Sequence, residues 1–498
     1  MARVCLAFSL SAFFASRAVA AAAGRLGLRG TQDVLDDASA LGAGAFDAGA
    51  LDALDAGALD AGALDVGALD VGALDAGAPE SREMFSLAAS APAAGPRRVF
   101  AGVTYEAIGT LSAADLNHIL RVEAPAFTQA HVSYAPATNG VRLFRVVYGS
   151  VIPERGNRRT RASGLVAIPD AGAAAQPLPL LSYQHGTVVD SKYNVPSSFV
   201  ANTSSAAALV TGETRLVVAQ FAGQGYVVAA ADYFGLGLSQ EPDGYAVLGS
   251  HNQACFDMLE AALGVADAEG VVVRPDGKFV AGWSQGGKVT MALLEHLHRN
   301  KYAVRAAATA AAQCDAFAML NGYLSFPRGA ANSSTRDAPW VAALFILTAF
   351  SYENYYGLPG LSQSLIVPHM YDVARSVYTK PPINGSWAVD DLHELIRPEF
   401  FDPVFFADSQ YGRIMQQLFT YRWLMETPVK MFYGGADESL TTGIATMPAR
   451  YQQSMGTGNT RVTAHLVGKK ANHRQTFGIA LKKWKKYFDS VLADDPHS

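Results

Sequence analysis

A serine flanked by glycines, where a strand-like segment meets a helix-like one, is the most restrictive feature of this sequence. Residues 278–281 read KFVA, residues 282–286 read GWSQG, and an amphipathic helical pattern follows over 287–300. A Gly-x-Ser-x-Gly pentapeptide in this context is typical of a strained turn that lifts a serine hydroxyl above a strand end. The flanking glycines remove Cβ atoms that would clash there. The pattern predicts that Ser284 is a nucleophile; the alternative is an ordinary tight turn.

A serine hydroxyl is a poor nucleophile without a general base. In folds built around this turn, the order along the chain is serine, carboxylate, histidine. Asp437 follows the apolar segment 428–435, and His473 follows the apolar segment 461–468. We therefore predict that Ser284, Asp437 and His473 form a catalytic triad.

The acid and the base each have a rival. Glu438 adjoins Asp437, which we favour because its position relative to the strand end suits this topology. His465 lies inside an expected strand, where a histidine is more often a core or surface residue than a base. His473 therefore remains the predicted base.

Two backbone N–H groups should stabilise the oxyanion that forms during acyl transfer. One belongs to Gln285, the residue after the nucleophile, and the other to the loop after the segment LLSYQHGT. In that loop we predict Thr187, with Gly186 as the lesser choice. His185 is expected to be structural, and Asp232 is expected to hold its own loop by hydrogen bonds.

Apolar strand-like segments alternate with amphipathic helical ones over most of the chain. This order predicts an α/β fold: a mostly parallel central sheet with helices on both faces and functional residues at the carboxyl ends of the strands. The expected strands lie within 141–152, 161–169, 178–187, 225–239, 278–284, 304–315, 428–435 and 461–468, and the expected helices are a short one after the capping-box-like Ser112–Asp115, then 205–224, 250–268, 287–300 and 475–492.

Residues 316–425 interrupt this alternation. About 110 residues are too many for a loop between two core strands, so we expect an inserted helical cap. It divides the α/β core into residues 99–315 and 426–498. Apolar stretches at 339–358 and 413–425 are expected to be helical, and a membrane anchor at 340–350 is the less favoured alternative because it is short. The cap's aromatic residues could line an acyl pocket or form the cap's own core; they are Trp340, Phe345, Phe350, Tyr352, Tyr355 and Tyr356.

The N-terminal part of the chain has a different character. Residues 1–23 have a basic start, a short apolar run and small residues, a pattern that predicts a cleaved signal peptide and hence secretion. An organelle transit peptide or an uncleaved anchor is the alternative. Residues 24–98 hold an acidic Ala-Leu-Asp-Ala/Val-Gly repeat whose period of five suits neither helix nor strand, so a disordered linker is expected over a short β-solenoid.

Charge and cysteine content limit the remaining possibilities. The formal net charge is −5, and residues 31–84 alone hold twelve acidic residues and one arginine, so the rest of the chain is nearly neutral and gives no reason to expect nucleic-acid binding. Beyond the signal segment, Cys255 and Cys314 could form one disulfide or remain two buried thiols. Neither has the spacing of a metal site.

Five segments in this order resemble the α/β-hydrolase superfamily: YQHGT (183–187), ADYFGLG (231–237), GWSQGG (282–287), YGGADES (433–439) and ANHRQTF (471–477). The resemblance covers residues 135–492 and is greatest to secreted lipases and carboxylesterases with a helical cap. It implies a serine carboxylester hydrolase with no cofactor, a small-molecule or lipid ester as substrate, and transient contact of the cap with a lipid interface. A serine peptidase or amidase of the same fold, or a non-catalytic ligand-binding homologue, is the alternative.

Overall fold

A computed structural model of the chain describes residues 97–170, 176–189, 191–199, 212–325, 339–380, 389, 391–455 and 460–494. The predicted signal peptide at 1–23 and nearly all of the acidic repeat and linker at 24–98 lie outside the described residues. So does the first part of the helix expected at 205–224.

The described strands form one ten-stranded sheet in the order β1-β2-β3-β4-β6-β5-β7-β8-β9-β10. The six strands from β6 to β10 in this order run parallel, as predicted. Non-consecutive neighbours such as β6, β5 and β7 require crossover connections, which the helices supply. The strands are β1 (Arg98–Phe100), β2 (Val103–Leu111), β3 (Val141–Ile152), β4 (Arg158–Pro169), β5 (Leu178–Gln184), β6 (Val227–Ala231), β7 (Val273–Trp283), β8 (Ala306–Ala310), β9 (Val429–Gly434) and β10 (Val462–Gly468).

The N-terminal strands add an antiparallel edge that the sequence did not reveal. β1, β2, β3 and β4 pair antiparallel in turn, and β4 pairs antiparallel with β6. Only five residues separate β3 from β4, which is too short for a parallel crossover. β2 was not predicted, and its register shifts between Ala107 and Gly109, which interrupts the two-residue alternation that identifies strands.

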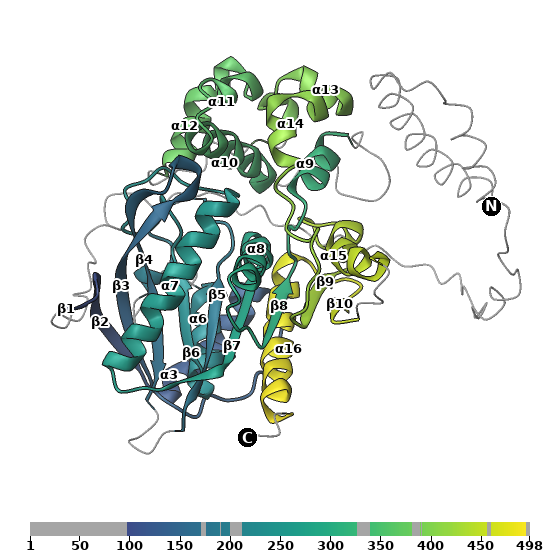
Figure 1. Cartoon of the computed structure of the whole chain (residues 1–498). Coiled ribbons are helices and arrows are strands. Elements are labelled where there is room, and N and C mark those ends of the chain that lie inside the picture. The colour runs from purple at the N-terminus through teal and green to yellow at the C-terminus, as the bar shows by residue number, and fades with distance from the viewer. Residues whose placement is uncertain are drawn as a thin grey trace, which may run out of the picture. The chain divides into compact units, whose positions relative to one another are not determined.

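Helices cover both faces of the sheet (Figure 1). α7 and α8 pack against each other on one face, and α4, α6 and α16 pack together on the other. The capping box expected at Ser112 and Asp115 is present at the start of α3. The helices of the core are α3 (Ala113–His118), α4 (Ala124–Thr128), α6 (Gly212–Phe221), α7 (Leu248–Ala268), α8 (Gln285–Arg299), α15 (Thr442–Ser454) and α16 (His473–Ala493).

A helical cap is inserted between β8 and β9, as predicted, and gathers beyond one end of the sheet (Figure 1). The stretch 413–425, expected to be helical, is helical only to Met415. The Gln452 side chain instead binds the backbone that follows: it donates to Tyr421 O at 3.3 Å and Trp423 O at 2.6 Å and accepts from Met425 N at 3.0 Å. The cap helices are α9 (Ala316–Ser325), α10 (Pro339–Tyr355), α11 (Leu361–Leu365), α12 (Tyr371–Thr379), α13 (Pro403–Asp408) and α14 (Gln410–Met415).

Two open alternatives are resolved by the described residues. Cys255 and Cys314 are both buried free thiols rather than a disulfide. Within the described part of the chain, no helix combines the length and the hydropathy needed to cross a membrane, so α10 is not such a span.

Candidate active site

Ser284 occupies the turn between β7 and α8 in a conformation rarely adopted by residues with a side chain. Its φ and ψ are 59° and −121°. A Cβ atom on Gly282 would lie 2.3 Å from Gly286 O, and one on Gly286 would lie 1.9 Å from Gln184 O. Only glycine fits at either position, which explains the motif in steric terms. The Ser284 N–H donates to Ala310 O at 2.9 Å, which ties the turn to β8.

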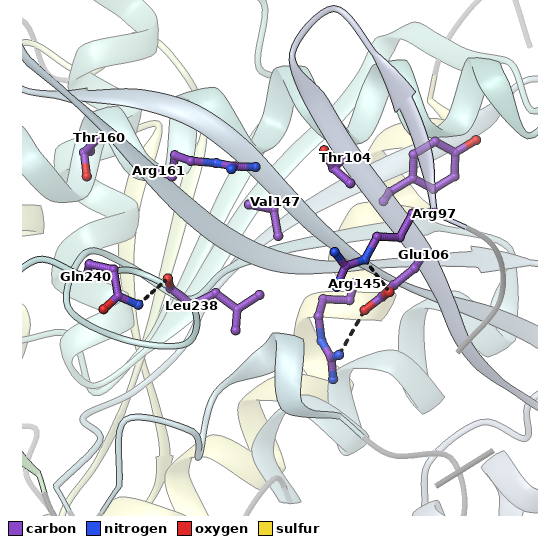
Figure 2. Close-up of a pocket in the computed structure, with 10 residues that line it drawn as sticks. Arg97, Thr104, Glu106, Arg145, Val147, Thr160, Arg161, Leu238 and Gln240 are labelled. Atoms are coloured by element: carbon purple, nitrogen blue, oxygen red, sulfur yellow. Dashed lines mark hydrogen bonds and ion pairs between the residues drawn. The ribbon is translucent and has the colours of Figure 1, made fainter. Parts of the chain in front are cut away.

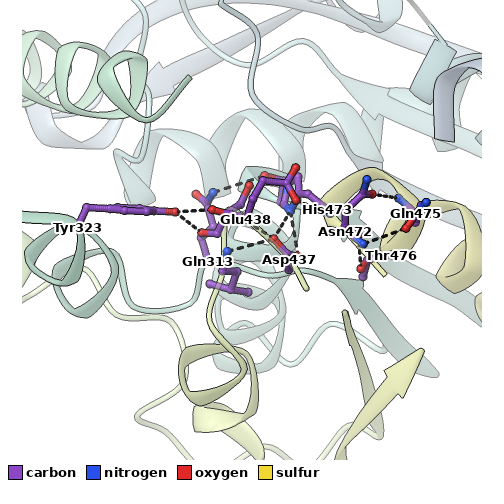
Figure 3. A network of polar contacts seen from close by, with 11 residues as sticks. Gln313, Tyr323, Asp437, Glu438, Asn472, His473, Gln475 and Thr476 are labelled. Carbon is purple, nitrogen blue, oxygen red and sulfur yellow. Dashed lines mark hydrogen bonds and ion pairs between the residues drawn. The ribbon is translucent and has the colours of Figure 1, made fainter. Parts of the chain in front are cut away.

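The predicted base and acid lie in direct contact (Figure 3). His473 Nδ1 is 3.0 Å from Asp437 Oδ1 and 3.1 Å from Asp437 Oδ2. Asp437 Oδ1 also accepts from the N–H groups of Ser439 at 2.9 Å and Leu440 at 3.1 Å, so the turn after β9 holds the carboxylate itself. The carboxylate can thus fix the imidazole tautomer that leaves Nε2 as the proton acceptor.

The two rivals make contacts of another kind. Glu438 accepts from the backbone N–H of His473 at 3.0 Å, so it binds the first turn of α16 rather than the imidazole. His465 Nε2 lies 2.7 Å from Thr463 Oγ1, and its ring stacks on Phe432. These contacts favour Asp437 and His473 over Glu438 and His465.

The structure brings His473 beside the serine turn. The Trp283 ring, one residue before Ser284, packs on the His473 ring with 5.0 Å between centroids. Gln313 Nε2 lies 3.5 Å from Ser284 Oγ. Gln313 was not predicted from the sequence, although its position just past β8, at the carboxyl edge of the sheet, was an available signal.

The two predicted oxyanion donors differ in how they are placed. Gln285 is the first residue of α8, where a backbone N–H has no intrahelical acceptor. The Thr187 hydroxyl lies 3.1 Å from Tyr245 OH, and its backbone N–H has no acceptor among the described residues. The N–H of Gly186 instead donates to Glu213 Oε1 at 2.8 Å. The N–H of Gly186, our lesser choice of oxyanion donor, therefore already has an acceptor.

The residues expected to be structural have structural contacts. His185 is buried, stacks on Tyr233 with 4.1 Å between ring centroids, and places Nδ1 2.7 Å from Gly186 O. Burial lowers the pKa of His185 to about 4, so it stays neutral. Asp232 accepts from Ser163 Oγ at 2.5 Å and from Ser197 N at 2.8 Å, which ties the segment after β6 to β4 and to the short turn that carries Ser197.

Glu213, in the first turn of α6, is a buried carboxyl group that sequence reasoning missed. It accepts hydrogen bonds from Gly186 N and from Tyr183 OH, directly below the loop that carries Thr187. Burial raises the pKa of Glu213 to about 7, against the opposing effect of these hydrogen bonds and of the charges of Arg474 and His473. No motif surrounds residue 213, so the sequence offered no signal.

Cavities in the structure lie apart from these residues. One of about 600 Å³ lies against β2, β3 and β4, where Arg97 and Arg145 both pair with Glu106 (Figure 2). Another, of about 450 Å³, lies where the cap meets the core and includes Phe350 and Lys380. Neither is lined by a predicted site residue, so neither locates the reaction. Among the described residues, no cluster of three or more His, Cys, Asp or Glu side chains is suited to a metal ion.

The cap's aromatic residues are mostly packed. Phe345 and Tyr352 are fully buried, Phe350 stacks on Tyr378 with 5.1 Å between centroids, and Tyr355 OH donates to Pro242 O at 2.8 Å. These contacts favour a role in the cap's core and in its attachment. The Trp340 side chain lies outside the described part of the chain.

Comparison with known proteins adds structural likeness only. No family model matches the chain, and no curated protein matches its sequence. A Legionella pneumophila protein provisionally named a hydrolase matches 80% of this chain and 99% of its own, with a TM-score of 0.65 and 20% identity. The rice cell wall degrading esterase LipA of Xanthomonas oryzae matches 81% of this chain and 99% of its own, with a TM-score of 0.63 and 17% identity.

Candida antarctica lipase A in its closed state matches less of the molecule. It covers 70% of this chain and 78% of its own, with a TM-score of 0.52 and 14% identity. At such identities the likeness establishes the fold alone. The chain has the α/β-hydrolase fold, as its motifs predicted.

Proposed function

We propose that this protein is a serine hydrolase that cleaves carboxylic esters. One observation carries the proposal: the strained Ser284 turn adjoins His473, whose Nδ1 lies 3.0 Å from Asp437. Structural neighbours named as an esterase and a lipase support the ester class. Secretion, expected from residues 1–23, remains a prediction.

The proposed reaction proceeds through an acyl-enzyme. Ser284 Oγ attacks the ester carbonyl carbon while His473 Nε2 takes its proton. The oxyanion accepts hydrogen bonds from the N–H groups of Gln285 and Thr187, each worth about 3 kcal/mol of transition-state stabilisation. His473 then protonates the departing alcohol. Water, deprotonated by His473, hydrolyses the acyl-enzyme and restores Ser284.

Transient contact of the cap with a lipid surface is a further part of the proposal. Val404 and Phe405, on α13, are 68% and 43% exposed. Exposed apolar side chains on a cap suit partial entry into a lipid interface.

Hydrolysis of p-nitrophenyl esters tests the proposal. Wild-type protein should release p-nitrophenol, and Ser284→Ala should lower kcat by about 10⁶-fold without changing the unfolding transition. Equal turnover in the folded variant would end the proposal. Aminoacyl-nitroanilides, if cleaved faster than esters, would point instead to the peptidase or amidase alternative, and acyl chains from acetyl to palmitoyl would separate an esterase from a lipase.

A further inference from the structure

Two long helices begin side by side at the carboxyl edge of the sheet. α7 has 21 residues and α8 has 15, and the N-terminus of each carries a partial positive charge. At α7 the Glu154 carboxylate already accepts from Ser250 N at 3.1 Å and from Ser250 Oγ at 2.6 Å, so the first turn of α8 is the one left to bind another anion. The helices pack against each other, and Gln285 Nε2 lies 3.4 Å from His251 Nε2 across their first turns. The two first turns therefore meet in one small region, and the N-terminus of α8 supplies its positive potential.

Lys288 adds a full charge to this region. It is the fourth residue of α8, one helical turn after Ser284, and its N–H lies 3.3 Å from Ser284 O. Its charge acts on His251, in the first turn of α7, and on Asp315, which lies just past β8. Lys288 is 2% exposed, and its Nζ has no hydrogen-bond partner among the described residues.

His251 supplies a second donor without a partner. It is the fourth residue of α7 and is 1% exposed. Because the Gln285 side-chain nitrogen can only donate, His251 Nε2 must accept, and the neutral ring then carries its proton on Nδ1. His251 Nδ1 has no partner among the described residues. Burial, followed by the nearby Lys288 charge, lowers the pKa of His251 to about 3, which keeps the ring neutral.

The carboxylate that acts on the Lys288 charge, that of Asp315, already has other partners. Asp315 accepts from Ala318 N at 2.9 Å and from Tyr421 OH at 2.9 Å, and Arg422 lies 3.9 Å away. Burial lowers the pKa of Lys288 to about 8 although Asp315 opposes the shift, so the ammonium is mostly charged at neutral pH. A buried charge that lacks a hydrogen-bond partner costs several kcal/mol. An acceptor from outside the described chain would offset that cost.

We propose that Lys288, His251 and the first turn of α8 form a subsite for a carboxylate on the acyl part of the substrate. The inference rests on the proposed function. His473 protonates the leaving alcohol and begins α16, on the opposite face of the sheet from α7 and α8. The leaving group therefore belongs on the His473 side, and the acyl group on the Lys288 side. One helical turn, about 5 Å, separates Lys288 from the serine turn, a span that a short dicarboxylic half-ester can bridge.

Paired substrates test the subsite. The mono-p-nitrophenyl ester of adipic acid and p-nitrophenyl hexanoate have acyl groups of equal length, and only the first carries a terminal carboxylate. With the uncatalysed rate subtracted, Lys288→Met should lower the adipate-to-hexanoate ratio of kcat/KM at least tenfold, mainly through KM. Lys288→Arg should keep the ratio within threefold of wild type. Lys278→Met, which removes a lysine on the far part of β7, should change neither substrate.

An unchanged ratio in Lys288→Met overturns the proposal. Should that variant fail to fold, inhibition of the wild type decides: the monoamide of adipic acid should inhibit hexanoate ester hydrolysis at least tenfold more strongly than hexanamide, which lacks the terminal carboxylate, and equal inhibition overturns the subsite. If the wild type cleaves neither ester, the proposed function has failed. The subsite then stands or falls on whether adipate raises the Tm of the wild type more than that of Lys288→Met.

Discussion

The carboxyl edge of the sheet and the helical cap hold their polar residues by different kinds of contact. At the sheet edge, backbone groups do most of the fixing. Ser284 is tied through its N–H to Ala310 O, and Asp437 accepts two N–H groups from the turn in which it lies. The site residues are therefore placed largely by chain geometry.

The cap meets the core through side chains that converge on one loop. Ser351 Oγ and Tyr378 OH each donate to Asp243 O at 2.7 Å, and Lys380 pairs with the buried Asp243 carboxylate. We therefore expect a side-chain substitution at the sheet edge to change the rate of catalysis with little effect on the free energy of unfolding. A substitution at the cap junction leaves a buried polar partner without its contact, so it should lower the free energy of unfolding.

The largest expected effect comes from Asp437→Asn. The amide leaves the turn in place but favours the wrong imidazole tautomer, so kcat for ester hydrolysis should fall by about 10⁴-fold. Glu438→Gln is the matched control, because Glu438 binds the backbone of His473 rather than its ring, and should cost less than tenfold. A larger loss in Glu438→Gln than in Asp437→Asn would reverse the assignment of the acid.

At the cap junction, Lys380→Met should lower the free energy of unfolding by about 3–5 kcal/mol, because it leaves Asp243 buried and unpaired. The double variant Lys380→Met/Asp243→Leu should recover much of the loss in urea unfolding. A loss below about 1 kcal/mol in the single variant would show that the cap does not depend on this pair.

Gly286→Ala lies at the sheet edge but should affect stability, because it changes the backbone packing of the serine turn rather than the function of a side chain. The new Cβ would meet Gln184 O at 1.9 Å, so the free energy of unfolding should fall by about 3 kcal/mol. Gly149→Ala, where a Cβ meets no atom within 4 Å, should shift it by less than about 1 kcal/mol. If the two substitutions change the free energy of unfolding equally, the serine turn can accommodate a Cβ atom at residue 286.

The smallest effect concerns pH. The pKa of Glu213 is raised from 4.5 to about 7 in the fold, so the folded state binds the proton more tightly than the unfolded state. Its stabilising contribution is complete below about pH 4.5 and is lost as pH rises through 7. Glu213→Gln should therefore remove about 2 kcal/mol of the decline in unfolding free energy between pH 5 and 8. If the unfolding free energies of wild type and Glu213→Gln change with pH in parallel, the pKa of Glu213 is not raised in the folded protein.

The short sequence motifs predicted those site residues whose positions depend on the neighbouring turn or strand end. Ser284 sits in a five-residue motif, and Asp437 and His473 each follow an apolar strand, so the fold and the proposed triad could be inferred from the sequence alone. Contacts between distant segments could not be. Lys380 and Asp243 lie 137 residues apart, and no pattern at either position indicates the pair.

The prediction of a helix over 413–425 was wrong for a similar reason. The apolar stretch after Met415 looks helical in isolation. The amide of Gln452, on a later helix, instead binds the backbone of Tyr421, Trp423 and Met425 along a non-helical path. Glu213 was likewise invisible because it gains its role only when the loop that carries Gly186 is in place. Gln313 lies just past β8, where a signal was available, but its contact with Ser284 depends on the turn after the neighbouring strand.

Reaction with a fluorophosphonate tests most directly whether Ser284 is an activated nucleophile. Mass spectrometry of the labelled full-length protein should find one phosphonyl group per chain, on Ser284, and His473→Ala should suppress the labelling. A folded wild-type protein that stays unlabelled, or that carries the label on another residue, would contradict the account.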